Sequence, residues 1–337
     1  MKDSVLGSQV ASLASTLDAS YTYGTSLRKS LASDQSYGTF LLGYPISKSL
    51  APMLQNKLFC LAGLSWKYRL LESADQDDLL PHLASQDCVG AAVTMPHKVT
   101  FLTKVDDVTM EGRAIGAINT VFIRQSPMGH RRYIGTNTDC IGVREAFLRN
   151  ISPEGLARGT SSPALVIGGG GACRSAIFAL HEWFNVQTIY LVNRFKSEVD
   201  SIIRDFSQIP GWKAKLLHVD YVAQAQKADS PYFIVGTVPD YPPSTVEENL
   251  ASEIVKAFLM SGLTTEKGMV LEMCYFPRVR TTFFELAEAN GWQVIAGTEA
   301  MIWQGVAQQV LWTEDLLPAT GSIVDTASEM ISKEITV

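Results

Sequence analysis

Hydrophobic and polar positions along the chain alternate between two periods from residue 39 onwards. Short apolar runs typical of buried strands are followed by stretches whose apolar residues recur every three or four positions, as on an amphipathic helix. Strands are expected at 39–46, 65–72, 88–95, 117–123 and 131–136, and helices at 51–63, 75–85, 96–105 and 139–150. Strands that alternate with helices predict an α/β fold with mainly parallel pairing.

A second alternating series starts after residue 163. The segment 151–163 is rich in Pro, Gly and Ser, as expected of a connection between domains. Further strands are expected at 164–168, 188–193, 213–219, 232–238, 269–273 and 292–297, with helical spacing at 169–184 and 299–312. This half predicts a doubly wound parallel sheet of the Rossmann type.

Composition narrows the class of protein. The chain has 337 residues, which suits two domains, and its 46% hydrophobic and 18% charged residues are ordinary for a compact protein. A net charge of −6 disfavours nucleic acid or an anionic membrane as the main partner. The five cysteines lack metal-ligand spacing, which favours a reduced protein without a metal site.

The first 37 residues are rich in serine and lack the apolar core of a signal peptide. Asp3, Asp18 and Asp34 argue against a transit peptide, and no apolar run reaches the ~18 residues of a membrane span. We therefore expect a cytoplasmic protein with no membrane partner and a flexible tail over residues 1–37.

Four consecutive glycines, Gly168 to Gly171, lie between an expected strand and an expected helix. Glycines there let the backbone approach a pyrophosphate, and the N-terminus of the helix attracts the anion. The usual third glycine position holds Cys173, a small residue that suits close packing. The pattern predicts a dinucleotide site, although a plain tight turn is an alternative.

The end of the next expected strand bears on which dinucleotide binds. An acidic residue there holds the ribose 2′-hydroxyl of NAD, but this chain has Asn193 and Arg194 at that point. An arginine suits the 2′-phosphate of NADP, yet it also stacks on the adenine of either cofactor. The sequence therefore leaves NAD and NADP open.

Polar side chains gather near the ends of expected strands in the first half of the chain. They are Ser47, Ser49, Thr94, Lys98, Asn119 and Asp139. Taken alone, Ser49 and Asp139 are candidate helix caps, Asn119 is a candidate turn residue, and Lys98 is explained as a solvated lysine. Their convergence on one edge of one expected sheet favours a binding or catalytic site instead.

Five motifs carry a resemblance to a known family. The segments GYPISKSLAP, VTMPHK, GAINT, GTNTD and VIGGGGA occur in the order and spacing of the shikimate/quinate dehydrogenases. The resemblance extends from about residue 39 to about 313. The sequence between the motifs is most similar to fungal catabolic quinate/shikimate dehydrogenases.

The resemblance implies an N-terminal α/β substrate domain and a Rossmann domain, with a cleft between them. We expect the substrate-binding catalytic domain at 38–139, completed by helices in 298–337, and the NAD(P)-binding domain at 140–297. The implied activity is NAD(P)-dependent oxidation of quinate to 3-dehydroquinate, of shikimate to 3-dehydroshikimate, or of both. A monomer and a homodimer are both open.

The resemblance also assigns roles to residues. Lys98 and Asp139 are implied as the catalytic pair. The implied substrate contacts are Ser47, Ser49, Thr94, Asn119, Tyr275 and Gln304. The implied dinucleotide contacts are Gly168, Gly169, Gly170, Gly171, Ala172, Asn193, Arg194, Thr237 and Gly297.

Oxidation of an alcohol explains why a lysine and a carboxylate are needed together. Hydride leaves a carbinol carbon only as its hydroxyl proton is taken up. An ordinary lysine, with a pKa near ~10.4, keeps its proton at neutral pH, so we expect the two groups to share one proton as a coupled pair. Neighbouring His97 is interpreted as structural.

One departure from the family pattern bears on the substrate. The family often has two serines in its first motif, both binding the substrate carboxylate, but here Ser49 is followed two positions later by Ala51. We hypothesise that this smaller side chain makes room for the extra C1 hydroxyl of quinate.

Two alternatives to a quinate/shikimate dehydrogenase are open. They are a strict biosynthetic shikimate dehydrogenase and a non-catalytic quinate-sensing regulatory protein.

Overall fold

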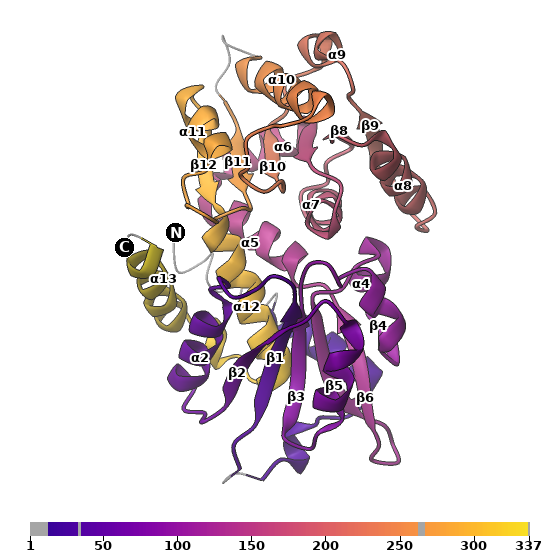
Figure 1. The fold of residues 1–337 in the computed structure, drawn as a ribbon, viewed down its shortest axis with the longest axis vertical. Coiled ribbons are helices and arrows are strands. Elements are labelled where there is room, and N and C mark those ends of the chain that lie inside the picture. Colours follow the sequence, from indigo (N-terminus) through magenta and orange to yellow (C-terminus); the bar gives the residue numbers. More distant parts are fainter. Residues whose placement is uncertain (1–12, 33–34, 262–266, 336–337) are drawn as a thin grey trace. The chain divides into compact units, whose positions relative to one another are not determined.

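The structure is a computed structural model, described here for residues 13–32, 35–261 and 267–335 (Figure 1). Its contacts divide the chain into two compact units, one comprising residues 1–142 and 301–337 and the other comprising residues 143–300. The chain passes from one unit to the other inside two helices, α5 (Asp139–Asn150) and α12 (Gly297–Thr313).

The first unit is built on a mixed sheet. Its strands are β1 (Gly38–Gly43), β2 (Lys67–Glu72), β3 (Cys88–Val93), β4 (Asp107–Val108), β5 (Thr120–Gln125) and β6 (Arg131–Thr136). Its other helices are α2 (Ala51–Leu61), α3 (Leu80–Ala84), α4 (Met110–Ile115) and α13 (Gly321–Ile335), with short 3₁₀ helices at 21–23, 28–30, 76–79, 100–104 and 317–319. The described strands run in the order β2-β1-β3-β5-β6-β4.

Pairing in this sheet is less parallel than the sequence predicts. β1 is parallel to β2 and β3, but β5 is antiparallel to both β3 and β6. The connection from β5 to β6 is a short turn closed by a 2.8 Å hydrogen bond from the Ser126 N–H to the His130 carbonyl. A turn of this length joins only antiparallel neighbours, because a parallel pair needs a crossover of a dozen residues or more.

The prediction of a helix at 96–105 is also wrong. Only Thr100–Lys104 is helical, and its geometry is 3₁₀. The carbonyl of Lys98 accepts the Ile118 N–H at 2.8 Å, so it is not available to a helical turn. The hydroxyls of Thr100 and Thr103 also donate to nearby backbone carbonyls. These local hydrogen bonds compete with the α-helix.

The second unit is a fully parallel sheet in its described residues. Its strands are β7 (Ala164–Ile167), β8 (Thr188–Val192), β9 (Lys215–His218), β10 (Phe233–Gly236), β11 (Met269–Glu272) and β12 (Gln293–Ala296). Its other helices are α6 (Pro153–Ser161), α7 (Gly171–Glu182), α8 (Lys196–Ser207), α9 (Val222–Lys227), α10 (Val246–Met260) and α11 (Thr282–Ala289). The strand order β12-β11-β10-β7-β8-β9 is that of a Rossmann fold, which confirms the predicted α/β class.

The segment 151–163, expected to be a plain connection, contains helix α6. Ser152 caps it by accepting the Gly155 N–H at 3.0 Å, and Pro153 follows at the first helical position. Gly159 packs so closely against Phe233 that a β-carbon there would collide with the ring. The glycine that suggested a loop is therefore explained by tight packing of a helix on β10.

The described residues 13–32 and 35–37 do not form the expected flexible tail; residues 1–12 and 33–34 lie outside the described residues. Residues 13–20 are helical, and Leu13, Leu17 and Leu27 are buried in the first unit. The backbone of Thr25 pairs with Gln125 at the end of β5. Spaced leucines in a serine-rich segment thus supply enough apolar surface to fix it on the domain.

In the part of the chain that the structure describes, every helix is too short or too polar to span a lipid bilayer.

Candidate active site

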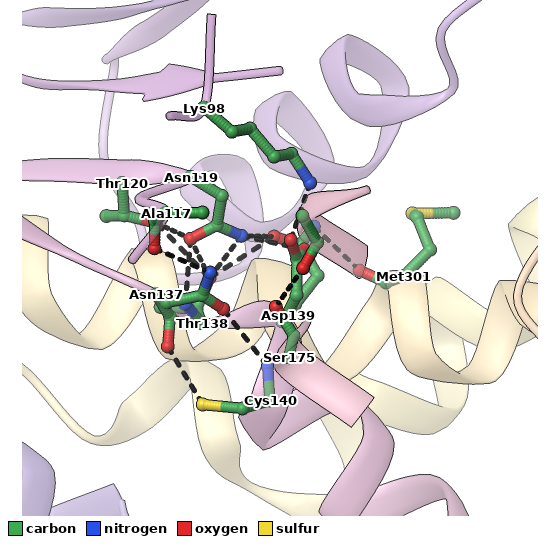
Figure 2. A network of polar contacts seen from close by, with 12 residues as sticks. Lys98, Ala117, Asn119, Thr120, Asn137, Thr138, Asp139, Cys140, Ser175 and Met301 are labelled. Carbon is green, nitrogen blue, oxygen red and sulfur yellow. Dashed lines mark hydrogen bonds and ion pairs between the residues drawn. The ribbon is translucent and has the colours of Figure 1, made fainter. Parts of the chain in front are cut away.

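Lys98 and Asp139 meet in the first unit (Figure 2). The Lys98 Nζ donates to Asp139 Oδ2 at 2.5 Å, and the two side chains are only 20% and 11% exposed. Lys98 follows β3 and Asp139 is the first residue of α5. A partly buried ammonium beside a carboxylate forms a unit that can take up and release one proton.

The sheet register explains why residues 41 positions apart converge. The carboxyl end of β3, the start of β5 and the carboxyl end of β6 lie at one edge, because Ala92 pairs with Thr120 and Thr120 pairs with Thr136. Backbone hydrogen bonds from Val93 to Asn119 and from Ile118 to Lys98, both 2.8 Å, fix the connecting loops. Lys98, Asn119 and Asp139 therefore emerge at the same edge.

Asn119 is the centre of the polar network around the pair. Its Nδ2 donates to Asp139 Oδ1 at 2.8 Å and to Gln304 Oε1 at 3.2 Å. Its Oδ1 accepts the Thr138 N–H at 2.7 Å, which fixes the orientation of the amide. Asn119 is buried, and it holds one carboxylate oxygen while Lys98 holds the other (Figure 2).

Ser49 and Thr94 lie just beyond the carboxyl ends of β1 and β3, at this edge of the sheet. The Ser49 hydroxyl accepts the Ala51 N–H at 3.2 Å, so it supports the start of α2 and keeps its own proton to donate. The Thr94 N–H donates to the Leu42 carbonyl at 2.8 Å. Ser47 is exposed. These hydrogen bonds connect Ser49 and Thr94 to their own neighbourhood rather than to the Lys98–Asp139 pair.

His97 has the structural role that the sequence suggested. Its ring is buried, and Nε2 lies 2.9 Å from the Ser73 carbonyl oxygen. That hydrogen bond ties the loop after β2 to the turn that carries Lys98.

The glycine loop of the second unit is a tight turn between β7 and the N-terminus of α7. Gly168 has a φ of +125°, a conformation that favours glycine, and a β-carbon there would collide with the Thr237 hydroxyl. A β-carbon on Gly169 would meet the Asn193 amide and the Glu198 carboxylate. Gly170 is the N-cap of α7, and Gly171 and Ala172 form its first turn. This N-terminus suits a phosphate group.

The other predicted dinucleotide residues surround this loop or follow neighbouring strands. Thr237 follows β10 and donates to the Ile167 carbonyl at 2.7 Å, and Asn193 donates to Glu198 at 2.6 Å. Gly297, after β12, has no room for a β-carbon against the carbonyls of Glu272 and Met273. Cys173 is fully buried, as close packing requires.

Arg194 has a partner that the sequence did not reveal. Its Nη1 donates to Glu248 Oε1 at 2.5 Å, and its guanidinium lies 4.7 Å from the Phe195 ring centre. Hydrogen bonds from the Ser244 N–H and hydroxyl, from Arg194 and from the Thr245 N–H lower the pKa of Glu248 to about 2. Glu248 is therefore ionised at neutral pH.

Tyr275, predicted as a substrate contact, belongs to the second unit and follows a buried carboxyl group. Burial raises the pKa of Glu272 to about 8, although the Cys274 N–H donates to its Oε1 at 2.9 Å. Glu272 is therefore largely neutral at pH 7.

Comparisons with known proteins identify relatives of this chain. Residues 41–121 match the family model of the shikimate dehydrogenase substrate binding domain. A quinate dehydrogenase of Emericella nidulans is 36% identical over 318 residues, which cover 90% of this chain and 96% of that protein.

Two solved structures extend the comparison. The protein AroM of S. pombe, described as dehydroquinate dehydratase and shikimate dehydrogenase, is 28% identical with a TM-score of 0.67. The match covers 86% of this chain but 53% of AroM, so this chain spans about half of that protein. The shikimate 5-dehydrogenase of Thermus thermophilus, solved with NADP(H) and shikimate, is 26% identical with a TM-score of 0.65, and the match covers 86% of this chain and 99% of that one.

Identity of 36% across nine-tenths of the chain, together with the fold of both units, confirms the family that the five motifs indicated. The chain belongs to the shikimate/quinate dehydrogenase family.

Proposed function

We propose that this chain is an NAD(P)-dependent dehydrogenase that oxidises a ring hydroxyl of quinate, yielding 3-dehydroquinate, and accepts shikimate as a second substrate. The observation that carries the proposal is the 2.5 Å contact between Lys98 and Asp139 within a buried polar network. A quinate-sensing protein without catalysis has no need of such a pair, so the pair favours an enzyme.

In this proposal the Lys98–Asp139 pair takes up the hydroxyl proton of the substrate as the carbinol C–H bond breaks. A bound nicotinamide supplies the acceptor for the hydride. Asn119 keeps Asp139 oriented toward Lys98, and Gln304, held by its own donation to the Met301 carbonyl at 3.0 Å, presents its carbonyl oxygen to Asn119. The products are a ketone, a reduced dinucleotide and one proton.

The second unit has the features that a dinucleotide requires. In this proposal Gly168 and Gly169 form the tight turn, the open space at Gly170 would admit the pyrophosphate, and the N-terminus of α7 would face it. We assign the further contacts to Gly170, Gly171, Ala172, Asn193, Arg194, Thr237 and Gly297.

The substrate contacts follow from chemistry and position. A polyol carboxylate needs donors and acceptors around every hydroxyl, which hydroxyl and amide side chains supply. We assign them to Ser47, Ser49, Thr94, Asn119 and Gln304 of the first unit and to Tyr275 of the second unit. We also propose a cytoplasmic location, because all five cysteines, each within the described residues, are free thiols.

One assay matrix tests the function. Quinate and shikimate are each offered with NAD⁺ and with NADP⁺, and dinucleotide reduction is followed by absorbance. We expect turnover with quinate and at least one dinucleotide. Binding of quinate without turnover in all four combinations would favour the sensor, and turnover of shikimate alone would favour the strict shikimate dehydrogenase.

The variant Ala51→Ser tests the determinant of substrate choice. A second serine hydroxyl near Ser49 would fill the space proposed for the C1 hydroxyl of quinate. We expect the ratio of kcat/KM for quinate to that for shikimate to fall about tenfold, since an unpaired or displaced hydroxyl costs roughly 1–3 kcal/mol. Equal efficiency with both substrates in the wild type and in Ala51→Ser would refute this role of residue 51.

The variant Arg194→Ala tests cofactor recognition. If Arg194 binds a 2′-phosphate, it must first leave Glu248, and the variant should lose activity selectively with NADP⁺. If Arg194 only stacks on adenine, KM should rise to a similar extent for NAD⁺ and NADP⁺. Apparent KM values for both cofactors at saturating quinate distinguish the two cases. Arg280→Ala, which removes an exposed arginine paired with Glu288, is the control.

A further inference from the structure

Three buried glutamines of the first unit have no place in the proposed chemistry. Gln55 on α2 and Gln308 and Gln309 on α12 are 0%, 2% and 0% exposed. Glutamine is rarely buried to this extent, because every amide atom without a partner costs free energy. A leucine at each position would fill the core without that cost, so packing alone does not explain these residues.

The glutamines form one directed chain of hydrogen bonds. Gln309 Nε2 donates to Gln55 Oε1 at 2.7 Å, and Gln55 Nε2 donates to Gln308 Oε1 at 2.8 Å. Gln308 Nε2 then donates to the Thr120 hydroxyl at 3.0 Å. The carbonyl oxygens of Gln55 and Gln308 are each engaged by the previous member, so each of these amide groups must direct its N–H toward the next one.

This series of hydrogen bonds continues to the carboxylate of Asp139. The Thr120 hydroxyl donates to Asn119 Oδ1 at 2.8 Å, and Asn119 Nδ2 donates to Asp139 Oδ1 at 2.8 Å (Figure 2). Gln308 donates to the Thr120 hydroxyl, and the nearer of the two oxygens open to its single proton is Asn119 Oδ1, at 2.8 Å against 3.2 Å for the Thr138 hydroxyl. We call Gln309, Gln55, Gln308, Thr120 and Asn119 the amide chain.

We propose that Thr120 and Gln308 are positioning residues, which act through Asn119 to hold the Asp139 carboxylate against Lys98. This inference rests on the proposed function. All members donate in the same direction, and hydrogen bonds in such a series strengthen one another in a low-dielectric interior. The amide chain thus ends in the donation of the Asn119 amide to the Asp139 carboxylate.

The direction of the effect on pH dependence follows from this geometry. Donation from Asn119 stabilises the ionised carboxylate. When the donation weakens, the Lys98–Asp139 pair holds its proton more tightly and is ready to accept the substrate proton only at higher pH. The acidic limb of the kcat/KM profile for oxidation therefore moves upward.

The test compares Thr120→Val, which is isosteric but lacks the hydroxyl, with the wild type. We expect kcat to fall about tenfold with KM within about twofold, and the acidic limb to move up by about half a pH unit. Thr120→Ser, which keeps the hydroxyl, should restore both values. Gln308→Leu should move the limb in the same direction by a smaller amount.

A matched control lies on the same helix as Gln308. The buried Thr313 donates its hydroxyl to the Gln309 carbonyl at 2.7 Å but is not part of the amide chain. Thr313→Val should lower Tm and leave the pH profile unchanged. If Thr120→Val behaves in the same way, with a lower Tm and an unmoved limb, the residues only support packing and the inference is wrong.

The double variant Thr120→Val/Gln308→Leu tests whether the residues act in series. The acidic limb of its kcat/KM profile should coincide with that of Thr120→Val, because the loss of the Thr120 hydroxyl already interrupts the amide chain. Additive shifts would overturn the serial arrangement. If Gln308→Leu does not fold, the comparison of Thr120→Val with Thr120→Ser still tests whether the Thr120 hydroxyl has a positioning role. A wild type without turnover would reject the proposed function rather than this inference.

Discussion

The variant Lys98→Ala is expected to lose at least ~10²-fold in kcat, because loss of a positioned acid–base group removes that much rate enhancement or more. The Nζ atom of Lys98 is the group within 2.5 Å of Asp139, and alanine leaves nothing to share the substrate proton. Substrate binding should persist, since the hydroxyl and amide groups assigned to the substrate are unchanged. Steady-state rates and isothermal titration with quinate measure the two quantities.

Lys104→Ala is a matched control for this variant. Lys104 lies at the end of the 3₁₀ helix that follows Lys98, and it forms an ion pair with Asp77, whose side chain is 54% exposed. Because such an exposed pair contributes little, its removal should leave kcat within about twofold of the wild type. A rate close to that of the wild type in Lys98→Ala would show that the assigned mechanism is incorrect.

The variant Glu314→Ala is expected to lower the free energy of unfolding by about 3–5 kcal/mol, because it leaves a buried charge without its partner. Glu314 Oε1 lies 3.6 Å from Nη1 of Arg124, and the side chains are 3% and 1% exposed. The same carboxylate accepts the N–H groups of Leu27 and Arg28 at 2.9 and 3.1 Å and the Tyr21 hydroxyl at 2.9 Å. It thereby attaches residues 21–28 to the rest of the first unit.

Urea unfolding measures this loss, and limited proteolysis should show faster cleavage within residues 13–31. Arg28→Ala is the control, because its ion pair with Asp315 is 44% and 30% exposed. Such a surface pair contributes ~0–1 kcal/mol. A loss below about 1 kcal/mol in Glu314→Ala would mean that apolar burial of Leu13, Leu17 and Leu27 alone fixes the segment.

The sequence could predict those structural features that depend on short stretches of neighbouring residues. Gly63, the last residue of the expected helix 51–63, adopts a positive φ of 71° just beyond α2, a conformation that favours glycine at the end of a helix. The Rossmann unit was equally predictable, because strands β7, β8, β10 and β11 are short, largely buried apolar runs and the glycine loop lies directly between β7 and α7. Such signals are local, so they survive without knowledge of the fold.

Other features were decided only by the tertiary structure, because they join residues that are far apart in the chain. The antiparallel direction of β5, the contact of Arg194 with Glu248 and the burial of Glu314 against Arg124 all depend on which surfaces pack together. The same holds for Gln308, whose partners Gln55 and Thr120 are 253 and 188 residues away. Sequence by itself determined the two sheets and the positions of Lys98 and Asp139; packing brought that ammonium and carboxylate into contact and placed the buried Asn119 amide against the carboxylate.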